Sequence, residues 1–396
     1  SPERAREAAE RIRRITDQVE LFPGRRGAGH IFYNQVKLSG RVPQICCLFG
    51  PSAAGGAYIP SFCDIVIMVE GNASMYLGSP RMAEMVIGES TTLEEMGGAR
   101  LHATVSGCGD NLAEDDADAI DQARAWFSYF PSRWREDPPE YASAPPAREF
   151  TDDLVPASDT AGYDTHDVID ALVDEMSFFE IKPLFAPELV CGLGRLDGHP
   201  VGIVANNPAA KGGVLFVDSA DKAARFLGLC DVHGLPVLFL CDTPGFMVGP
   251  DAETTAQVRL FARLFVTAAA MRVPFGTVVL RKGYGLGAQA MAGGSFRAGL
   301  FTLSWPTGEF GGMGLEGAVR LGFRKELDAI VDEVEREETF DTMVAAAYER
   351  GQAINVAAHL ELDDVIDPAE TRARVIDAFA AAGPITEAPR RFVDPW

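Results

Sequence analysis

The apolar residues of the chain gather in short runs of the length of buried strands, bounded by small and turn-forming residues. Two such runs span 44–49 and 64–69, and two more span 277–280 and 300–305. Short apolar runs of this kind are typical of strands buried on both faces of a parallel sheet. A Gly/Ala-rich turn and a stretch of small residues separate the two runs of each pair, which predicts a βαβ order. The expected fold class is therefore α/β.

The two pairs of runs belong to an internal repeat. The triplet Arg41-Val42-Pro43 precedes the first pair, and the identical triplet Arg272-Val273-Pro274 precedes the second. Tyr76 and Phe310 follow the two pairs with nearly the same separation along the chain as the triplets. This steady spacing predicts two copies of one supersecondary unit, one in each of two domains.

A proline-rich stretch separates the two copies. Residues 136–160 combine several prolines with acidic and small residues. Such a composition predicts a linker or a surface excursion rather than a core element. We therefore expect one domain over residues 1–150 and a second over residues 151–396.

Other patterns predict single elements. Apolar runs over 189–196 and 201–205 flank Asp197-Gly198, a dipeptide that favours a tight hairpin. A helix is expected over 219–230, a core strand over 236–240 and a further helix over 1–20. After Glu326 the chain is expected to continue as an acidic amphipathic helix whose apolar side carries Leu327, Ile330, Val331 and Val334.

Composition narrows the classes of protein to consider. Apolar residues make up 47% of the 396 positions and charged residues 23%, which is typical of a chain that buries a large core. The 57 acidic residues outnumber the 35 basic ones, and the net charge of −22 disfavours binding to nucleic acid. No apolar run approaches the ~20 residues of a transmembrane helix, so we expect no membrane association and a cytoplasmic location. The seven cysteines form no C-x-x-C pair, and we expect neither a metal site nor a disulfide framework.

The candidate chemistry lies at two glycine-rich turns, Gly50 to Ala57 and Gly283 to Ala288. A turn of glycine and alanine between a strand and a helix leaves backbone N–H groups unshielded, so it can hold an anion or a developing oxyanion. The alternative is that the glycines only allow close packing of helix on strand. Duplication of the turn favours the first interpretation. Neither turn carries a Walker sequence or the full dinucleotide-binding fingerprint.

Taken together, the motifs resemble those of the carboxyltransferase (beta) subunits or domains of biotin-dependent acyl-CoA carboxylases, in the crotonase superfamily. The similarity covers about residues 24–135 and 164–368. Its most specific pieces are His30 to Gln35, Gly50 to Pro60, Gly97 to Ala99, Leu196 to Asn206, Asp218 to Phe226, Asp242 to Phe246 and Trp305 to Thr307. The resemblance implies two crotonase-like domains, each a ββα spiral, related by the internal duplication.

The resemblance also implies a role for each turn. The first turn would bind the thioester oxygen of an acyl-CoA through the N–H groups of Ala54 and Gly55. The second would bind the ureido oxygen of biotin through the N–H groups of Leu286 and Gly287. A reaction of this type requires no side-chain base.

Three neighbouring residues are expected to contact the substrates. Gly56 and Gly285 are off-by-one alternatives for the two donor pairs, because the turns differ by one position when both are aligned from their Arg-Val-Pro triplets. Gln289 stands beside the acyl pocket, where acetyl- and propionyl-CoA enzymes of the family resemble one another in having Asp. The acyl group is therefore left open between acetyl, propionyl and a longer or branched chain.

The implied function is transfer of a carboxyl group from carboxybiotin to the α-carbon of an acyl-CoA. It implies biotin carboxylase and biotin carboxyl carrier components as partners, in separate subunits or in a longer chain, and a homo-oligomer, expected to be a hexamer. Two alternatives stay open, namely a decarboxylase subunit that runs the transfer in reverse and a non-catalytic assembly scaffold. Relatives carry a long segment before the first turn where this sequence has only Ser1 to Leu21, so we expect further residues or a larger chain.

Four other polar residues have simpler expected roles. Asp242 follows a predicted strand, and we expect its side chain to cap the turn formed by Thr243-Pro244-Gly245. His30, His102 and His233 are expected at the surface or at caps.

Overall fold

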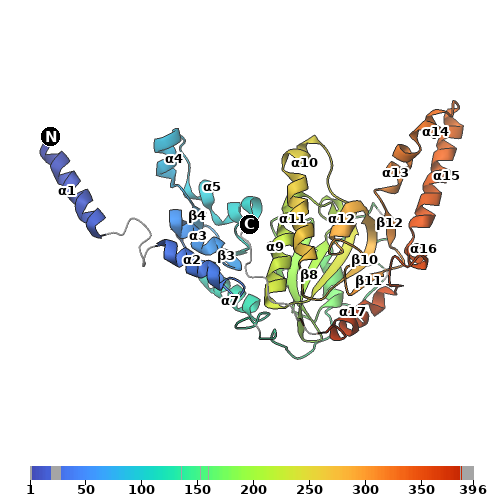
Figure 1. The fold of residues 1–396 in the computed structure, drawn as a ribbon, viewed down its shortest axis with the longest axis horizontal. Helices are drawn as coiled ribbons and strands as arrows, with labels where there is room; N and C mark the ends of the chain where they lie inside the picture. The colour runs from blue at the N-terminus through green and yellow to red at the C-terminus, as the bar shows by residue number, and fades with distance from the viewer. Residues whose placement is uncertain are drawn as a thin grey trace.

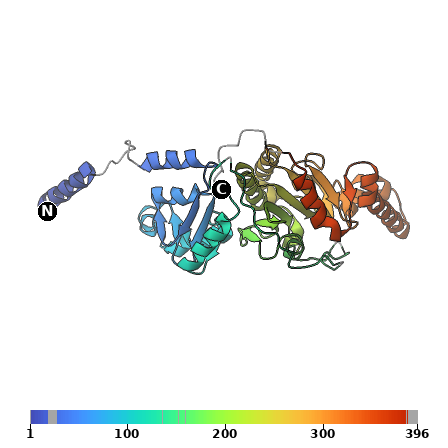
Figure 2. The same ribbon diagram turned by 90° about the horizontal axis from the view of Figure 1, so that it is seen from below.

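The chain folds into two layered α/β bodies that lie side by side. The computed structural model describes residues 2–18, 28–134, 136–151, 153–158, 160–383 and 385. Figures 1 and 2 show the elements between residues 28 and 127, coloured blue to teal, as one body and the elements coloured green to red as the other, while the helix over residues 2–18 stands apart from both. Both combine mostly parallel strands with covering helices, which confirms the expected fold class.

The N-terminal body is built around two small parallel sheets. Strands β1, β3 and β5 form one sheet, and β2 and β4 form the other. The chain begins with α1 (Pro2–Gln18), which stands apart from this body (Figure 1). The elements of the body are α2 (Ala28–Leu38), β1 (Ile45–Leu48), β2 (Pro51–Ala53), η1 (Ala54–Ala57), α3 (Tyr58–Ser61), β3 (Ile65–Val69), β4 (Ser74–Tyr76), α4 (Pro80–Ile87), α5 (Leu93–Gly97), α6 (Ala99–Leu101), η2 (His102–Ser106), β5 (Asn111–Ala113) and α7 (Asp116–Phe127).

The C-terminal body is built around one large sheet in the order β13-β11-β10-β9-β8-β7-β6, with β12 paired to the end of β10. Its strands are β6 (Phe179–Ile181), β7 (Leu189–Leu196), β8 (His199–Asn206), β9 (Val237–Thr243), β10 (Phe275–Tyr284), β11 (Phe301–Ser304), β12 (Glu309–Gly311) and β13 (Asp364–Val365). Its helices are α8 (His166–Leu172), η3 (Lys211–Gly213), α9 (Val217–His233), α10 (Pro250–Thr254), α11 (Gln257–Ala269), α12 (Gly285–Ala290), α13 (Leu315–Gly322), α14 (Arg324–Asp328), α15 (Glu333–Gly351), α16 (Ala353–Ala358), η4 (Pro368–Glu370) and α17 (Thr371–Ala380).

Strand pairing fixes the register of the internal repeat. β2 pairs with β4 so that Ala53 lies opposite Tyr76. In the second copy the end of β10 pairs with β12, and Tyr284 lies opposite Gly311. Ala53 and Tyr284, which end the strands that lead into the two turns, keep the same separation as the two Arg-Val-Pro triplets, as predicted. The counterpart of Tyr76 is Gly311, so its expected alignment with Phe310 is wrong by one position.

Alternate residues of the large sheet face two different cores. Along β9, Phe239 packs with side chains of α9 and α11, whereas Leu240 packs with side chains of α8 and β11. This alternation follows from the two-residue period of a strand. The first of these cores also takes in Ile67 of β3 and Trp126 of α7, so the two bodies share apolar packing.

Buried polar contacts also join the bodies. The Lys182 ammonium lies 3.0 Å from an Asp110 carboxylate oxygen, and both side chains are fully buried. The Arg225 guanidinium donates to the carbonyl oxygen of Cys63 at 2.8 Å. Because a core and ion pairs cross between the bodies, neither is an isolated unit, and the boundary between residues 150 and 151 stays a prediction.

Most of the single elements predicted from the sequence are present. The hairpin of β7 and β8 turns at Asp197 and Gly198, which have φ angles of 52° and 83° as a tight primed turn requires. The predicted helices and strand over 219–230, 236–240 and 1–20 correspond to α9, β9 and α1. Across the described residues, no helix has both the length and the apolar character needed to span a bilayer.

The chain after Glu326 is mainly helical, as expected, but the helix is interrupted at the residues expected to form its apolar side. α14 ends at Asp328, and α15 begins at Glu333. Asp332 starts the new helix because its carboxylate accepts hydrogen bonds from the backbone N–H groups of Val334 and Glu335, both at 2.9 Å. Because of the break, the expected apolar side is divided: Leu327 is buried, whereas Val331 is 96% exposed and Val334 is also exposed.

Candidate active site

The C-terminal turn follows directly from the end of β10. Tyr284 is still extended, with φ −104° and ψ 133°, and the next residue, Gly285, has a φ of 60°. A Cβ atom at Gly285 would lie 2.8 Å from the carbonyl oxygen of Gly312, so glycine is required for both its backbone conformation and its close approach. The N–H groups of Leu286 and Gly287 fall in the first turn of α12, where a helix has no internal acceptor for them.

The N-terminal turn has the same backbone course. Ala53 is extended, with φ −108° and ψ 151°, and Ala54 then has a φ of 51°. Ala54 is thus the structural equivalent of Gly285, since each directly follows the strand residue that the repeat register relates. An alanine in this left-handed region costs roughly 1–2 kcal/mol that glycine avoids. The strain marks a conformation imposed by the surrounding fold.

This register relates the expected donor residues of the two turns. With Ala54 equivalent to Gly285, Gly55 corresponds to Leu286 and Gly56 to Gly287. The expected pairs Ala54/Gly55 and Leu286/Gly287 are therefore out of step by one position. The pair that matches Leu286 and Gly287 is Gly55 and Gly56.

A cavity of about 960 Å³ opens at the C-terminal turn. Gly285, Leu286 and Gln289 line it together, so three of the expected site residues meet at one wall. Its other lining residues combine apolar and charged side chains, including Phe296, Arg297, Phe310, Arg350, Val356 and Leu360. Ala54 and Gly55 are exposed on the N-terminal body and are not among the residues that line it.

Gly287 is buried behind this wall. A Cβ atom built at Gly287 would lie 2.6 Å from the Cα atom of Gly245 and 3.1 Å from the backbone nitrogen of Phe246. The loop that follows β9 therefore packs directly against the start of α12. This contact leaves no room for a side chain at Gly287.

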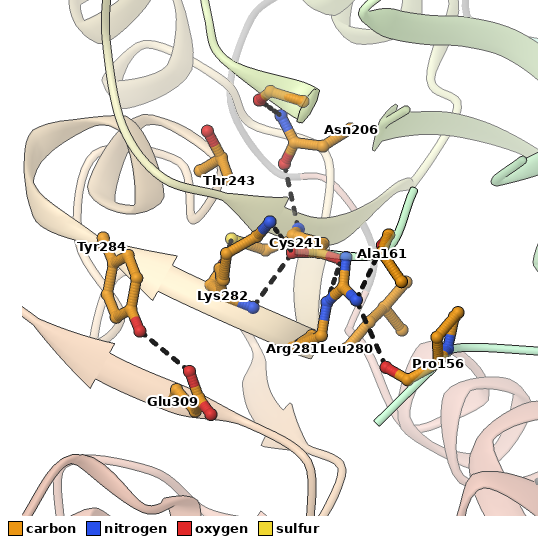
Figure 3. Close-up of polar contacts among 12 residues, drawn as sticks. Pro156, Ala161, Asn206, Cys241, Thr243, Leu280, Arg281, Lys282, Tyr284 and Glu309 are labelled. Carbon is orange, nitrogen blue, oxygen red and sulfur yellow. Dashed lines mark hydrogen bonds and ion pairs between the residues drawn. The ribbon is translucent and has the colours of Figure 1, made fainter. Parts of the chain in front are cut away.

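A buried ionic network holds that loop in place (Figure 3). Asp242, at the end of β9, accepts from Nε of Arg281 at 3.0 Å and from the backbone N–H of Lys282 at 3.1 Å. Its own backbone N–H donates to Oδ1 of Asn206 at 3.1 Å. The Asp242 side chain is fully buried and that of Arg281 is 1% exposed. The network therefore ties the end of β9 to β10, immediately before the turn.

Arg281 also fastens the segment that joins the two bodies. Its guanidinium donates to the carbonyl oxygens of Pro156 at 3.2 Å and of Ala161 at 3.0 Å. Figure 3 shows these bonds reaching from β10 to a separate stretch of chain. Sequence reasoning missed Arg281 as a positioning residue, because the pair Arg281-Lys282 after a strand signal was equally compatible with a solvated surface.

Two expectations for polar residues are wrong. Asp242 does not cap the turn that follows it; the Thr243 hydroxyl does so instead, accepting from the backbone N–H of Gly245 at 3.1 Å. His233 is not at the surface but is 3% exposed, with its ring 3.4 Å from a carboxylate oxygen of Asp64. Both residues lie at ends of elements that the folded chain covers.

His166 gives the C-terminal body a pH-dependent contact. Its ring lies 2.6 Å from Oδ1 of Asp164 and 2.9 Å from Oε2 of Glu180, and the hydrogen bond with Glu180 is the main cause that raises the pKa of His166 to about 9. Because the folded pKa exceeds the unfolded value of roughly 6.5, the stabilisation is complete below about pH 6.5 and is lost as the pH rises to 9.

We therefore expect the free energy of unfolding to fall between pH 6.5 and 9, and to fall less in a His166→Gln variant. The difference between the two proteins is expected to stay below about 1 kcal/mol, because the ring is 35% exposed and solvent screens its ion pairs. Urea unfolding of both proteins at the two pH values measures it. Identical pH dependence would contradict the assignment.

Comparison with known proteins supports the duplicated arrangement. The family model described as the carboxyl transferase domain matches residues 14–391. A Bacillus subtilis (strain 168) relative, uncharacterized carboxylase YngE, is 56% identical over 81% of this chain and 63% of its own length. A biotin-dependent acetyl-/propionyl-coenzyme A carboxylase beta5 subunit from Mycobacterium leprae is 37% identical over 88% of this chain and 66% of its own length. This chain thus spans somewhat less than two thirds of the length of these relatives.

Solved structures show the same fold. Transcarboxylase 12S, described as a hexamer and determined with methylmalonyl-coenzyme A and methylmalonic acid bound, matches with a TM-score of 0.84 and 34% identity over 92% of this chain and 71% of that one. A single-chain, multi-domain long-chain acyl-CoA carboxylase matches with a TM-score of 0.76 and 43% identity over 90% of this chain and 35% of that one. With the family match across nearly all of its residues, the chain belongs to the carboxyl transferase domain family.

Proposed function

We propose that this chain transfers a carboxyl group from carboxybiotin to the α-carbon of an acyl-CoA. The observation that carries the proposal is the pair of equivalent turns, Ala54 to Gly56 and Gly285 to Gly287, which share one backbone course in one register of the repeat. A reaction in which two oxygen atoms gain negative charge needs two separate sets of preorganised donors. The duplicated turn supplies one set in each body.

The C-terminal turn fits the ureido group of biotin. The N–H groups of Leu286 and Gly287 lie in the first turn of α12, and close packing fixes the start of that helix, because a Cβ atom at Gly285 or Gly287 would collide with the backbone of Gly312 or Gly245. The adjoining cavity of about 960 Å³ has room for a bicyclic ring together with the reacting end of a thioester.

Each of the two turns would stabilise negative charge on a different substrate oxygen. Carboxybiotin, when bound, supplies the carboxyl group. The N–H groups of Leu286 and Gly287 would then stabilise charge on the ureido oxygen, and those of Gly55 with Gly56 or Ala54 would stabilise charge on the thioester oxygen. Each donor contributes on the order of 3 kcal/mol of transition-state stabilisation. Holding the two reactants together supplies most of the remaining rate enhancement.

The proposal extends to partners. The chain would depend on biotin carboxylase and biotin carboxyl carrier components, in other subunits or in a longer polypeptide. A hexamer is proposed by analogy with the transcarboxylase 12S assembly. Sedimentation of the purified protein tests the assembly, and a stable, active monomer would contradict it.

A substitution at Gly55 tests the proposed function. Gly55 belongs to the donor pair under either alignment of the N-terminal turn, and Gly55→Val is expected to lower turnover about 100-fold because its branched side chain covers or tilts one donor. The measurement is acyl-CoA-dependent decarboxylation of free carboxybiotin, which needs no partner subunit.

Gly55→Ala is the matched control. A Cβ atom at Gly55 would lie 3.5 Å from Cζ of Phe32, an ordinary contact, so the alanine variant should keep most of its activity. A folded Gly55→Val protein with unchanged turnover would remove the N-terminal turn from the mechanism.

Gln289 is proposed to set the preference for the acyl chain. Its side chain lines the cavity beside Gly285 and Leu286. An amide lacks the charge of a carboxylate and can present either a donor or an acceptor, so it constrains a short acyl group less tightly. We expect Gln289→Asp to shift relative kcat/KM towards short acyl-CoAs by about tenfold, which corresponds to roughly 1.4 kcal/mol.

Acetyl-, propionyl-, octanoyl- and palmitoyl-CoA compared side by side on both proteins measure this shift. An unchanged ranking of the four substrates would separate Gln289 from specificity while leaving the carboxyl transfer itself intact.

A further inference from the structure

A second group of reactive side chains lies in the N-terminal body, around the short element η2. This element is a π-helical turn, His102–Ser106, and it is followed by Gly107, Cys108 and Gly109. π-Helical turns are uncommon and often occur at functional sites. Neither the proposed carboxyl transfer nor the two glycine-rich turns uses these side chains.

The position of the His102 ring fixes its tautomer. Nε2 lies 2.8 Å from the carbonyl oxygen of Met75, which can only accept a hydrogen bond, so Nε2 carries a proton. In the neutral ring Nδ1 is therefore an acceptor. It lies 2.7 Å from the hydroxyl oxygen of Ser106, and that oxygen in turn accepts from the backbone N–H of Cys108 at 3.3 Å. The basic nitrogen of His102 thus faces the segment that carries Cys108.

A buried positive charge lies on the other side of the same segment. The Lys182 ammonium donates to the carbonyl oxygen of Gly107 and contacts that of Gly109 at 3.5 Å, so it touches the backbone on both sides of Cys108. Asp110 pairs with the ammonium at 3.0 Å. The ammonium thus places positive charge at the backbone that flanks Cys108, in the segment that the imidazole acceptor of His102 faces, and such surroundings favour the thiolate.

The seven cysteine thiols differ in the direction in which their pKa values are shifted. The hydrogen bond with His102 is the largest cause that lowers the pKa of Cys108, and Lys182 adds to it. Burial raises the pKa values of the other six thiols, those of Cys46, Cys47, Cys63, Cys191, Cys230 and Cys241. Cys108 is also half-buried, as are Cys46 and Cys47, whereas the other four cysteines are buried.

Cys108 is mechanically connected to the N-terminal turn. Its side chain packs against the same small apolar core as Ala57, the last residue of η1. Met75, whose carbonyl holds the His102 ring, lies in β4 opposite Ser52 of β2, the strand that leads into the turn. A group added to Cys108 would therefore press on the elements that support the turn.

We propose that Cys108 is an activated thiol, with His102 as its proton acceptor, that reacts with small soft electrophiles and thereby disables the neighbouring turn. With hydrogen peroxide, the thiolate sulfur forms a bond to one oxygen while the O–O bond breaks. Hydroxide leaves and takes up the proton held by His102, so that the products are a sulfenic acid and water. With an alkyl halide, the S–C bond forms and halide departs.

Alkylation of the intact protein with limiting iodoacetamide tests the proposal. Peptide mass spectrometry should find Cys108 labelled at least about tenfold faster at pH 7 than any other cysteine, with a midpoint of its pH–rate profile below the ordinary thiol value of about 8.5. His102→Gln should slow the labelling of Cys108 about tenfold, whereas the exposed His199→Gln control should not. Equal labelling of a second cysteine, or an ordinary profile in the unmodified sequence, would overturn the assignment.

A separate measurement tests whether modification of Cys108 disables the N-terminal turn. Acyl-CoA-dependent decarboxylation of carboxybiotin should fall in proportion to the fraction of Cys108 modified by peroxide, and a thiol reductant should restore it. The Cys108→Ser variant should keep its activity under the same peroxide treatment. Full activity in fully modified protein would refute the coupling, and it would leave the proposed carboxyl transfer untouched.

Discussion

A Gly287→Ala variant is expected to lose carboxyl transfer by about 1000-fold while remaining folded. The added methyl group would sit 2.6 Å from Cα and 2.8 Å from the carbonyl carbon of Gly245. Backbone atoms cannot rotate away as a flexible side chain would, so the start of α12 must shift. The N–H groups of both Leu286 and Gly287 move with it, and the loss of even one oxyanion donor costs roughly 100- to 1000-fold.

The chain offers a matched control for this change. Gly317→Ala introduces the same methyl group in α13, where the nearest atom is the terminal carbon of Met313 at 3.9 Å, and it should leave turnover unchanged. Decarboxylation of free carboxybiotin measures both variants, and circular dichroism checks that each is folded. If Gly287→Ala is folded and fully active, the donors of the C-terminal turn lie elsewhere.

The glycine-rich turns could be located from the sequence because their signal is local. Glycine and alanine between an apolar run and a helix are typical of a tight turn between a strand and a helix. The internal repeat supplied a second turn with which the first could be compared. Their exact register could not be found in this way. It depends on the left-handed conformation of Ala54, a residue type that normally avoids it, and on the pairing of Ala53 with Tyr76 across two strands.

The residues that support the turns could not be predicted from the sequence, because their contacts join distant parts of the chain. Asp242 and Arg281 lie far apart along the chain, and only the parallel pairing of β9 with β10 brings them together. His233 gave no sign of burial, because its environment is built by Asp64 from the other body. Contacts between distant segments carry no local pattern, so the structure was needed to find them.

Replacing Asp242 by asparagine is expected to lower the free energy of unfolding by about 3–5 kcal/mol. The change leaves the Arg281 guanidinium almost completely buried without its counter-charge, which is the costly way to break a buried ion pair. The end of β9 loses its tie to β10, and Arg281 no longer holds a fixed position against the carbonyl groups of Pro156 and Ala161. Proteolysis near Pro156 should therefore also become faster.

Two further variants test whether the loss of stability comes from the buried charge of Arg281 or from removing any carboxylate. Asp121→Asn breaks the ion pair with Arg124, whose two side chains are 75% and 77% exposed, and its effect should stay below about 1 kcal/mol. The double variant Asp242→Asn/Arg281→Met removes the stranded charge and should recover part of the loss. Urea unfolding of the four proteins measures these differences. If the double variant is no more stable than Asp242→Asn alone, the cost lies in lost packing, and the ionic network does not hold the turn.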